Sequence, residues 1–335
     1  MKPLRIALRQ IRGGSGVDVW AESFCRGLWK AGQECSLDLL SPVYQVAPSI
    51  ASLSRSPFRS DIVHGNSWNG FAFRQECPLV VTEHLVVHDP ALAPYKTPAQ
   101  KLYHRWIYRC ERKSFEAADA IVSVSRYTRQ KAEELFGLSD TIMIYNGIDA
   151  SLYQPRETSR ASWGIPEDRC VLLYTGNLSR RKGSDLLLPI MKQLGGRFLL
   201  LTTSGNRKTV QTTLPFSRNI GYLDPEQLVQ AYNMCDVFII PSRMEGLSLS
   251  ALEAMSCARP VIAFDCSSFP ELVVDGKGGF LCRFENVKEC AERIRYLAEE
   301  PELARRMGAF NRGQVLEKFT LEDMVRNYLR LYRSL

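Results

Sequence analysis

Two glutamates, Glu245 and Glu253, stand on either side of a predicted change from loop to helix. An apolar run ends at Pro241, and because proline cannot continue a central strand, we expect the strand to stop there. Ser248 or Ser250 is the candidate cap of the helical pattern that follows. The eight-residue separation of the glutamates spans up to ~12 Å if it is mostly helical. That is about the reach from the sugar to the ribose of a nucleotide sugar, and the free N–H groups at the helix start would seat a phosphate between them.

Short apolar runs alternate with helical patterns along the chain, and these are the elements that must position the glutamates. In the first half such runs predict buried strands at Leu4 to Leu8, Ser36 to Leu40, Asp61 to His64, Leu79 to Val81 and Ala120 to Val124. A second series begins at Val171, and the stretch 154–169 between the series has no sustained period, which is typical of a linker. The alternation predicts an α/β fold with parallel sheets, in which ligands bind at the carboxyl ends of the strands.

Composition excludes several other classes. A chain of 335 residues suits two domains, and 45% hydrophobic with 24% charged residues is typical of a soluble globular protein. No apolar run approaches the ~20 residues that span a bilayer, and the N-terminus does not resemble a secretory signal. Ten cysteines without a C-x2-C pair favour reduced cytosolic thiols and argue against a zinc site. The net charge of +7 is compatible with an anionic ligand or an anionic membrane surface, and no signature of a nucleic-acid-binding module is present.

A glycine-rich turn, Gly13 to Gly16, lies between the first predicted strand and a helical pattern. Glycine lets backbone amides approach an anion closely, so Gly14, Ser15 and Gly16 are candidate phosphate contacts. The turn lacks the G-K-S/T of a P-loop and is not a full G-x-G-x-x-G fingerprint. From this piece alone, a phosphate seat and a plain tight turn between strand and helix remain equally good interpretations.

A basic stripe is predicted on the helix at 101–113, where Lys101, Arg105, Arg109 and Arg112 are spaced by four, four and three. A solvated helix face explains such a stripe in most proteins. The sharper hypothesis is a surface for anionic lipid or for a diphosphate-linked acceptor.

The stretch EGLSLSALEAMSCARPVIA, which contains both glutamates, resembles the E-x7-E block of the retaining glycosyltransferases of family 4. Other matches follow in the family's order: GGSG at 13–16, VVTEH ending at His84, VSVSRYT, YNGID, YTGNLSRRKGSDLL and PELVVDGKGGFL. The resemblance covers nearly the whole chain. It implies the GT-B fold, with two Rossmann-like domains whose parallel sheets face across a cleft. It also implies an acceptor-side domain at 1–158, a donor domain at 159–315 and a C-terminal helix at 316–335 that packs back on the first domain.

The resemblance also implies roles for the site residues. Glu245 would bond the donor sugar's hydroxyls and Glu253 the ribose hydroxyls, while His84 would face the transferred sugar and Lys182 the diphosphate. Glu245, His84 and Lys182 are thus the candidate catalytic residues. The candidate donor-binding set is Gly14, Ser15, Gly16, Gly176, Asn177, Arg180, Arg181, Lys182, Tyr222, Glu245, Gly246, Leu247, Ser248, Leu249 and Glu253. The sequence departs from the family's pattern at two places. Asn177 stands where the family usually has an arginine, which Arg180 or Arg181 would replace, and Cys266-Ser-Ser-Phe replaces a common Gly-Gly pair.

The residues and the resemblance together predict a retaining, metal-independent glycosyltransferase that uses a UDP- or GDP-sugar. No D-x-D motif is present, and fixed cations and amides would stabilise the leaving group, so no cofactor and no metal are expected. The expected acceptor is a glycan or lipid-linked molecule of bacterial cell-surface polysaccharide or lipopolysaccharide synthesis. The expected location is the cytoplasm, or the cytoplasmic face of the inner membrane as a peripheral protein. Two alternatives remain open: an epimerase of the same fold, and a catalytically idle sugar-nucleotide-binding scaffold.

Overall fold

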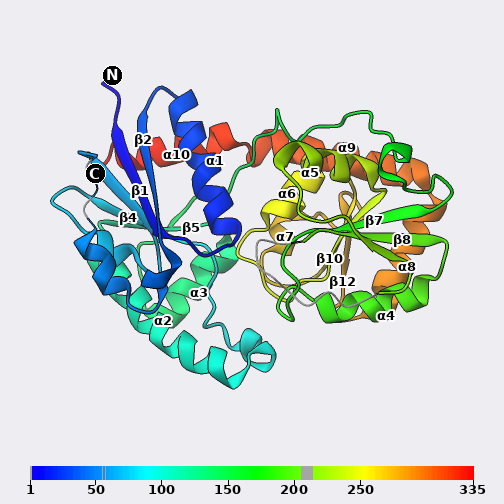
Figure 1. The fold of residues 1–335 in the computed structure, drawn as a ribbon, viewed down its shortest axis with the longest axis horizontal. Coiled ribbons are helices and arrows are strands. Elements are labelled where there is room, and N and C mark those ends of the chain that lie inside the picture. Colours follow the sequence, from blue (N-terminus) through cyan, green and yellow to red (C-terminus); the bar gives the residue numbers. More distant parts are fainter. Residues whose placement is uncertain (1, 55, 57, 205–213) are drawn as a thin grey trace. The chain divides into compact units, whose positions relative to one another are not determined.

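The computed structural model describes residues 2–335 except 55, 57 and 205–213, and contacts within this part of the chain divide it into two compact units (Figure 1). Unit 1 comprises Met1–Gly147 and Leu321–Leu335, and unit 2 comprises Ile148–Thr320. The chain therefore passes from unit 1 to unit 2 once and returns once.

The first crossing lies earlier than the stretch 154–169 that has the composition of a linker. Packing explains the difference, because Tyr153 and Ile165 are buried. Arg160 pairs with Asp236 at 2.7 Å, which ties the irregular segment to the strands that follow. This segment is therefore an ordered part of unit 2.

The described part of unit 1 is built on a six-stranded parallel sheet in the order β2-β1-β3-β4-β5-β6. The strands are β1 (Arg5–Ile11), β2 (Glu34–Leu40), β3 (Ile62–Asn66), β4 (Leu79–Glu83), β5 (Ala120–Ser123) and β6 (Ile142–Met143). The α-helices are α1 (Gly16–Lys30), α2 (Pro98–Ala117), α3 (Arg126–Phe136) and α10 (Leu321–Tyr332), and the 3-10 helices are η1 (Pro42–Gln45), η2 (Pro48–Leu53), η3 (Gly70–Phe73) and η4 (Pro90–Tyr95). In Figure 1, α1 and α10 lie on one side of this sheet, and α2 and α3 lie on the other.

The C-terminal helix α10 belongs to the core of unit 1. Tyr328 is fully buried, and Tyr332 hydrogen-bonds the ring of His64 on β3. Helix α10 also crosses α1 closely at Gly27, where an added Cβ would lie 2.7 Å from Val325 Cγ2. Glycine permits this approach because it has no side chain to displace.

The described part of unit 2 contains a second six-stranded parallel sheet, in the order β12-β11-β10-β7-β8-β9. The strands are β7 (Cys170–Tyr174), β8 (Phe198–Thr202), β9 (Ser217–Asn219), β10 (Val237–Ile240), β11 (Val261–Phe264) and β12 (Gly279–Cys282). The helices are η5 (Ala161–Trp163), α4 (Ser184–Leu194), α5 (Pro225–Met234), α6 (Leu249–Ser256), α7 (Phe269–Leu272), α8 (Val287–Glu299) and α9 (Pro301–Lys318). Strands β10 and β11 are buried along their whole length and β7 from its second residue on, as expected where helices cover both faces of a parallel sheet.

The strand order of unit 2 reverses between β7 and β10, which lie side by side although β8 and β9 come between them in sequence. In an open α/β sheet the loops that leave such a switch point diverge to opposite sides and leave a ligand-binding crevice. Here the two loops run from Thr175 to Gly183 and from Pro241 to Ser248. They carry most of the residues that the sequence predicts for the donor.

All ten cysteines lie within the described residues and are free thiols. Within the same residues, no helix has both the length and the apolar character needed to cross a membrane.

Candidate functional site

The strand, loop and helix that carry the two glutamates form as the sequence predicts. Strand β10 ends at Ile240, directly before Pro241, and α6 begins at Leu249. Of the two candidate caps, Ser248 is the N-cap, because its Oγ accepts a hydrogen bond from the backbone N–H of Ala251 at 3.3 Å. The loop between strand and helix is buried throughout, including Gly246 and Leu247, so its backbone is held in one conformation.

Glu245 lies between two cations. Its Oε2 is 3.2 Å from Arg181 Nη1, its Oε1 is 3.4 Å from Lys182 Nζ, and Ser242 Oγ donates to Oε1 at 3.2 Å. The residue is only 9% exposed. Burial alone would raise its pKa, but Arg181 and Lys182 outweigh burial and lower it, so the carboxylate is ionised at neutral pH. The cluster thus gathers one anion and two cations at the edge of the sheet where ligands bind.

The loop that carries these cations is fixed against the loop of Glu245 at Gly183. Gly183 has φ of 67°, and an added Cβ would lie 1.9 Å from the carbonyl oxygen of Pro241. Only glycine fits this position, since the conformation is left-handed and the two backbones nearly touch. The Lys182–Gly183 pair therefore serves two purposes, a cation at the site and a close approach of the loops.

Arg243, on the loop after β10, also binds the loop after β7. Its guanidinium binds both carboxylate oxygens of Asp185, at 2.7 and 2.8 Å, and also contacts Glu285 and the carbonyl oxygen of Arg180. Its backbone N–H donates to the carbonyl oxygen of Arg181 at 2.8 Å. Arg243 is 6% exposed and was not among the residues predicted from the sequence. A charged residue next to a buried strand end was the only signal that could have identified it.

The structure distinguishes the two arginines that could stand in for the family's usual one. Arg181 contacts Glu245 and donates to the carbonyl oxygen of Met244 at 2.6 Å, whereas Arg180 is exposed. Asn177 receives a long hydrogen bond at its carbonyl oxygen from the Tyr174 hydroxyl (3.4 Å). Arg181 is thus the cation that accompanies Lys182 at the glutamate.

Two serines that depart from the family's glycine pair bind the backbone of Glu245. Ser267 Oγ accepts from the Glu245 N–H at 3.2 Å, and Ser268 Oγ donates to the Glu245 carbonyl at 3.1 Å. Ser267 has φ of 49°, a left-handed conformation that glycine adopts without strain. The backbone shape suited to glycine is therefore retained here, and the serine hydroxyls add contacts to the catalytic candidate.

Glu253 lies in the second turn of α6 and is 7% exposed. The hydroxyl of Tyr232 donates to its Oε2 at 2.7 Å. Burial raises the pKa of Glu253 to about 7, against hydrogen bonds from Tyr232 and Tyr153 that lower it. Near neutral pH this carboxyl is therefore close to the midpoint of its titration, unlike that of Glu245.

The other predicted donor residues of unit 2 take different positions. Gly176 has φ of 114°, and Lys182 Nζ lies 3.2 Å from where its Cβ would be, so the amine covers this glycine. Leu249 is half-buried at the start of α6. Tyr222 is 70% exposed on the loop after β9, so its side chain lies in solvent and not in the buried cluster around Glu245.

The glycine-rich loop of unit 1 already binds an anion from its own chain. Both Asp18 carboxylate oxygens accept from the Gly13 N–H, and Oδ2 also accepts from Gly14 N at 2.7 Å and Ser15 N at 3.3 Å. Gly16 begins α1. The loop thus has the anion-binding shape that the sequence suggested, but Asp18 fills it. The S-x-x-D capping pattern of Ser15 and Asp18 was the available signal.

His84 follows β4 and packs edge-on against Trp20, with ring centroids 4.6 Å apart. Burial lowers its pKa to about 3, so the imidazole is neutral, and within the described residues its Nε2 has no hydrogen-bond partner. His64, by contrast, is bonded on both ring nitrogens, to Tyr332 and to Thr82, and is a structural histidine.

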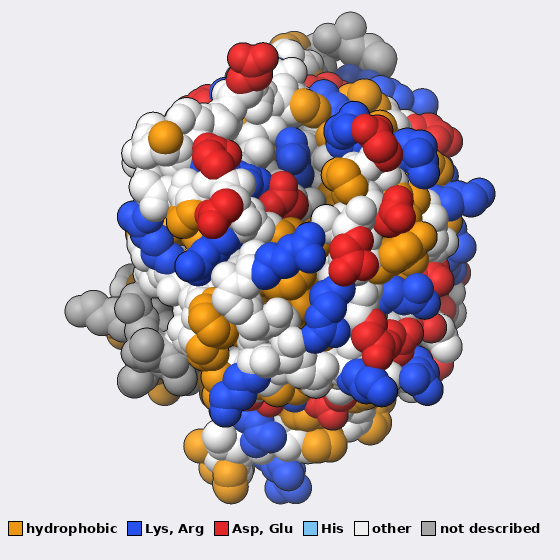
Figure 2. All heavy atoms as spheres, turned by 90° about the vertical axis from the view of Figure 1, so that its right-hand side faces the viewer, with side chains coloured by type: hydrophobic (Ala, Val, Ile, Leu, Met, Phe, Trp, Pro, Cys, Tyr) orange, Lys and Arg blue, Asp and Glu red, His pale blue; other side chains and the backbone are white. Residues whose placement is uncertain are grey.

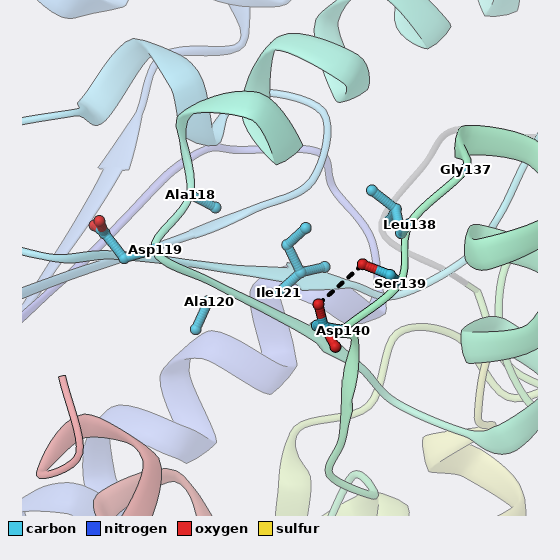
Figure 3. A pocket seen from close by; sticks show the side chains of 8 residues that line it. All are labelled: Ala118, Asp119, Ala120, Ile121, Gly137, Leu138, Ser139 and Asp140. Atoms are coloured by element: carbon cyan, nitrogen blue, oxygen red, sulfur yellow. Dashed lines mark hydrogen bonds between the residues drawn. The ribbon is translucent and has the colours of Figure 1, made fainter.

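A shallow cavity of about 300 Å³ lies elsewhere in unit 1, at the amino end of β5 (Figure 3). Its lining includes Asp119, Ser139 and Asp140, and Ser139 Oγ donates to Asp140 at 2.9 Å. None of the predicted site residues lines it. It lies at the edge of the sheet opposite the carboxyl strand ends and is separate from the candidate site.

Comparison with known proteins identifies the family. Residues 155–314 match the family of group 1 glycosyl transferases, and residues 34–152 match glycosyltransferase family 4. Alpha-maltose-1-phosphate synthase of Mycolicibacterium smegmatis is 27% identical over 82% of this chain and 79% of its own length. D-inositol 3-phosphate glycosyltransferase of the same organism is 28% identical over 84% and 69%.

Two solved structures share the fold. Sucrose-phosphate synthase of Thermosynechococcus elongatus superimposes with a TM-score of 0.86 at 21% identity and covers 99% of this chain and 98% of its own. Anabaena HepE in complex with UDP-glucose gives a TM-score of 0.75 at 17% identity, over 99% and 100%. The chain therefore belongs to glycosyltransferase family 4: it is a glycosyltransferase of the GT-B fold that acts on nucleotide sugars.

Proposed function

We propose that the chain is a retaining, metal-independent transferase that moves a sugar from a nucleoside-diphosphate sugar to a glycan or lipid-linked acceptor. The observation that carries this proposal is the contact of Arg181 and Lys182 with the buried carboxylate of Glu245, all within 3.4 Å. An ionised acid beside two cations offers acceptors for sugar hydroxyls and donors for a diphosphate in the same small volume. A UDP-sugar is the first donor to test, because the HepE structure holds UDP-glucose.

The chemistry follows from the charge that develops as the glycosidic bond to the leaving diphosphate breaks. Arg181, Lys182 and the N-terminal amides of α6 are positioned in advance, so they stabilise that charge without reorganisation. In this proposal they supply the positive charge that a divalent ion would otherwise provide. Glu245 binds the sugar hydroxyls and is not a nucleophile, and the leaving phosphate takes the proton of the attacking acceptor hydroxyl. The configuration at the anomeric carbon is then retained.

The test is transfer activity with a panel of UDP- and GDP-sugars and glycan acceptors, with and without EDTA. We expect Glu245→Gln to lower kcat by ~100-fold or more, since one preorganised contact to the reacting sugar is lost. Glu292→Gln, an exposed acid of α8 in the same unit, is the matched control and should leave the rate unchanged. Loss of activity in EDTA that added Mg²⁺ restores would refute the metal-independent part, and inversion at the anomeric carbon would refute retention.

The same assay separates the two alternatives. An epimerase converts the nucleotide sugar to an isomer without any acceptor, so product analysis in the absence of acceptor identifies it. A catalytically idle scaffold binds the nucleotide sugar but releases no nucleoside diphosphate with any acceptor. Release of UDP or GDP that depends on Glu245 excludes both.

The proposed acceptor is lipid-linked or part of a cell-surface glycan, and the proposed location is the cytoplasmic face of a membrane. Support comes from α2, on which Lys101, Arg105 and Arg109 are exposed next to Leu102, itself 70% exposed. Basic side chains beside an exposed apolar one are typical of a helix that rests on anionic lipid. By contrast, acidic and basic side chains are interspersed across the face shown in Figure 2.

Binding to vesicles tests this location. The protein should sediment with vesicles that contain phosphatidylglycerol and not with neutral vesicles, and added salt should weaken the binding. A variant with Arg105→Glu and Arg109→Glu should lose sedimentation but keep its thermal stability, because both side chains are exposed. Unchanged sedimentation of this variant would show that α2 is only a solvated helix face.

A further inference from the structure

A chain of hydroxyl groups holds Glu253 within unit 2. Tyr232, at the end of α5, donates to Glu253 Oε2 at 2.7 Å, and its own hydroxyl lies 3.2 Å from Thr175 Oγ1. A phenol has one hydroxyl hydrogen, and that hydrogen is given to the carboxylate. The Thr175 hydroxyl is therefore the donor to the phenol oxygen. The three groups are aligned in one direction, from Thr175 through Tyr232 to Glu253.

Tyr153 forms a second hydrogen bond to the same carboxylate. Its ring lies edge-on to that of Tyr232, with centroids 6.1 Å apart. The backbone carbonyl of Tyr153 accepts from Arg312 at 2.8 Å and from the hydroxyl of Ser256, the last residue of α6. The segment that carries Tyr153 is thus anchored to the helix that carries Glu253.

These contacts limit where the carboxylate can accept further hydrogen bonds. All three side chains are buried, with Tyr232 at 0%, Glu253 at 7% and Tyr153 at 8% exposure, so water competes weakly for them. A carboxylate offers about four acceptor positions, and the phenols of Tyr232 and Tyr153 occupy part of them. The remaining positions have a defined direction because the rings cannot rotate away from their packed neighbours.

We propose that Tyr232 and Tyr153 are positioning residues that hold the Glu253 carboxylate in the orientation that accepts hydrogen bonds from the ribose hydroxyls of the donor. The site then selects ribonucleotides over deoxyribonucleotides. This inference rests on the proposed use of a nucleoside-diphosphate sugar. It goes beyond that function by naming the residues that enforce ribose recognition.

The ionisation state of Glu253 also affects how strongly it binds the ribose. A ribose hydroxyl forms a stronger hydrogen bond to an ionised carboxylate than to a neutral carboxyl, and burial raises the pKa of this group to about 7. The phenol hydrogen bonds favour the ionised form and lower the pKa. Removing one phenol hydroxyl therefore raises the pKa further, and ribose recognition should then require a higher pH.

The experiment compares the affinities of UDP, 2′-deoxy-UDP and 3′-deoxy-UDP by calorimetry between pH 6 and 8.5. The ratio of affinities at each pH cancels the titration of the phosphates themselves. We expect wild type to prefer UDP to at least one deoxy analogue by ~10-fold or more at pH 8, the usual effect of a hydrogen bond to a charged group. In Tyr232→Phe the preference should fall below about 3-fold, and the pH at which it appears should rise.

Tyr328→Phe is the matched control, since Tyr328 is an equally buried tyrosine of unit 1 whose hydroxyl bonds Thr82 at 3.0 Å. It should keep both the preference and its pH dependence. If Tyr232→Phe does not fold, Thr175→Val and Tyr153→Phe each remove one hydroxyl of the same network and should reduce the preference. Conservation of the full preference and pH profile in the folded variants overturns the inference.

Other outcomes separate this inference from the proposed function. If wild type binds UDP tightly but does not distinguish it from either deoxy analogue, ribose recognition by Glu253 is refuted while the proposed function stands. If wild type binds neither UDP nor GDP in the same assay, the proposed donor class is wrong and the inference is refuted with it.

Discussion

Replacement of Arg243 should weaken both unit 2 and its nucleotide site. Arg243 is 6% exposed, and its guanidinium binds both carboxylate oxygens of Asp185 at 2.7 and 2.8 Å, with further contacts to Glu285 and to the backbone carbonyl of Arg180. Breaking a fully buried ion pair costs about 3–5 kcal/mol, because the remaining charge has no partner. Here the acid partners are 39% and 36% exposed, so water solvates them once the arginine is gone. We therefore expect Arg243→Ala to lower the free energy of unfolding by about 2–3 kcal/mol, below the fully buried value.

The loss should depend on pH in a defined direction. Burial alone would raise the pKa of Asp185, but the hydrogen bonds from Arg243 outweigh it and lower the pKa. A lowered pKa stabilises the folded state above the unfolded pKa of about 4, and this contribution disappears as the pH falls through the folded pKa. The difference between wild type and Arg243→Ala should thus be full at pH 7 and shrink below pH 4.

Urea unfolding monitored by circular dichroism measures this difference, and calorimetric titration with UDP measures the site. We expect Arg243→Lys to keep the charge but lose the fork geometry, and so to recover only part of the stability. Arg283→Ala, which breaks an ion pair to Glu289 from an 82% exposed arginine, is the control and should cost less than about 0.5 kcal/mol. A loss below about 0.5 kcal/mol for Arg243→Ala itself, with unchanged UDP affinity, would refute the reasoning.

Three further predictions follow from the backbone and from burial. Gly183→Ala should abolish UDP binding and lower the free energy of unfolding in urea by more than about 2 kcal/mol. Gly137→Ala is the control, since Gly137 has a similar φ but open space around it, and should lower that free energy by only about 1 kcal/mol. Equal losses would show that the contact with Pro241 is unimportant. In urea unfolding, Ser267→Gly should be more stable than Ser267→Ala by about 1 kcal/mol, since only glycine relieves the strain of the positive φ. The reverse order of stability would contradict that strain. Burial raises the pKa of Glu83 to about 8, so the folded state binds a proton that the unfolded state releases, and stability should fall between pH 5 and pH 8. Glu83→Gln should reduce this fall in Tm, and an unchanged Tm difference between the two pH values would exclude Glu83 as its source.

The sequence predicted the alternating strands well because buried parallel strands are short apolar runs with clear ends. Strand β10 ends at Ile240 as proposed, and the helix with Glu253 starts after one of the two proposed caps. It could not predict that Tyr153 lies in unit 2, since burial of an irregular segment leaves no periodic signal. The family pattern named Glu245 and Lys182, but their mutual distance depends on two loops that are 63 residues apart.

The supporting residues were the least predictable part. Ser267 and Tyr232 contact the two glutamates from elements that are distant in sequence, so no spacing rule connects them to the site. Arg243 is close to Glu245 in sequence, but its partners Arg180 and Asp185 lie on another loop and helix, so its role follows only from the fold. Asp18 is a different case. Its capping pattern was visible, but the hydrogen bonds from Gly13 and Gly14 follow only from the folded loop.

The return of α10 to unit 1 has a consequence for how the protein is made. Unit 2 is continuous in sequence, and its two ends meet, since Ile148 pairs with Thr320 and its N–H donates to Phe319 O at 3.0 Å. Unit 2 is thus an insertion within unit 1. On the ribosome, unit 2 is complete before Tyr328 and Tyr332 of α10 are synthesised. The core of unit 1, whose strands are made first, is therefore completed only after α10 has been added. Loss of the final fifteen residues would therefore damage the half of the protein that is made first.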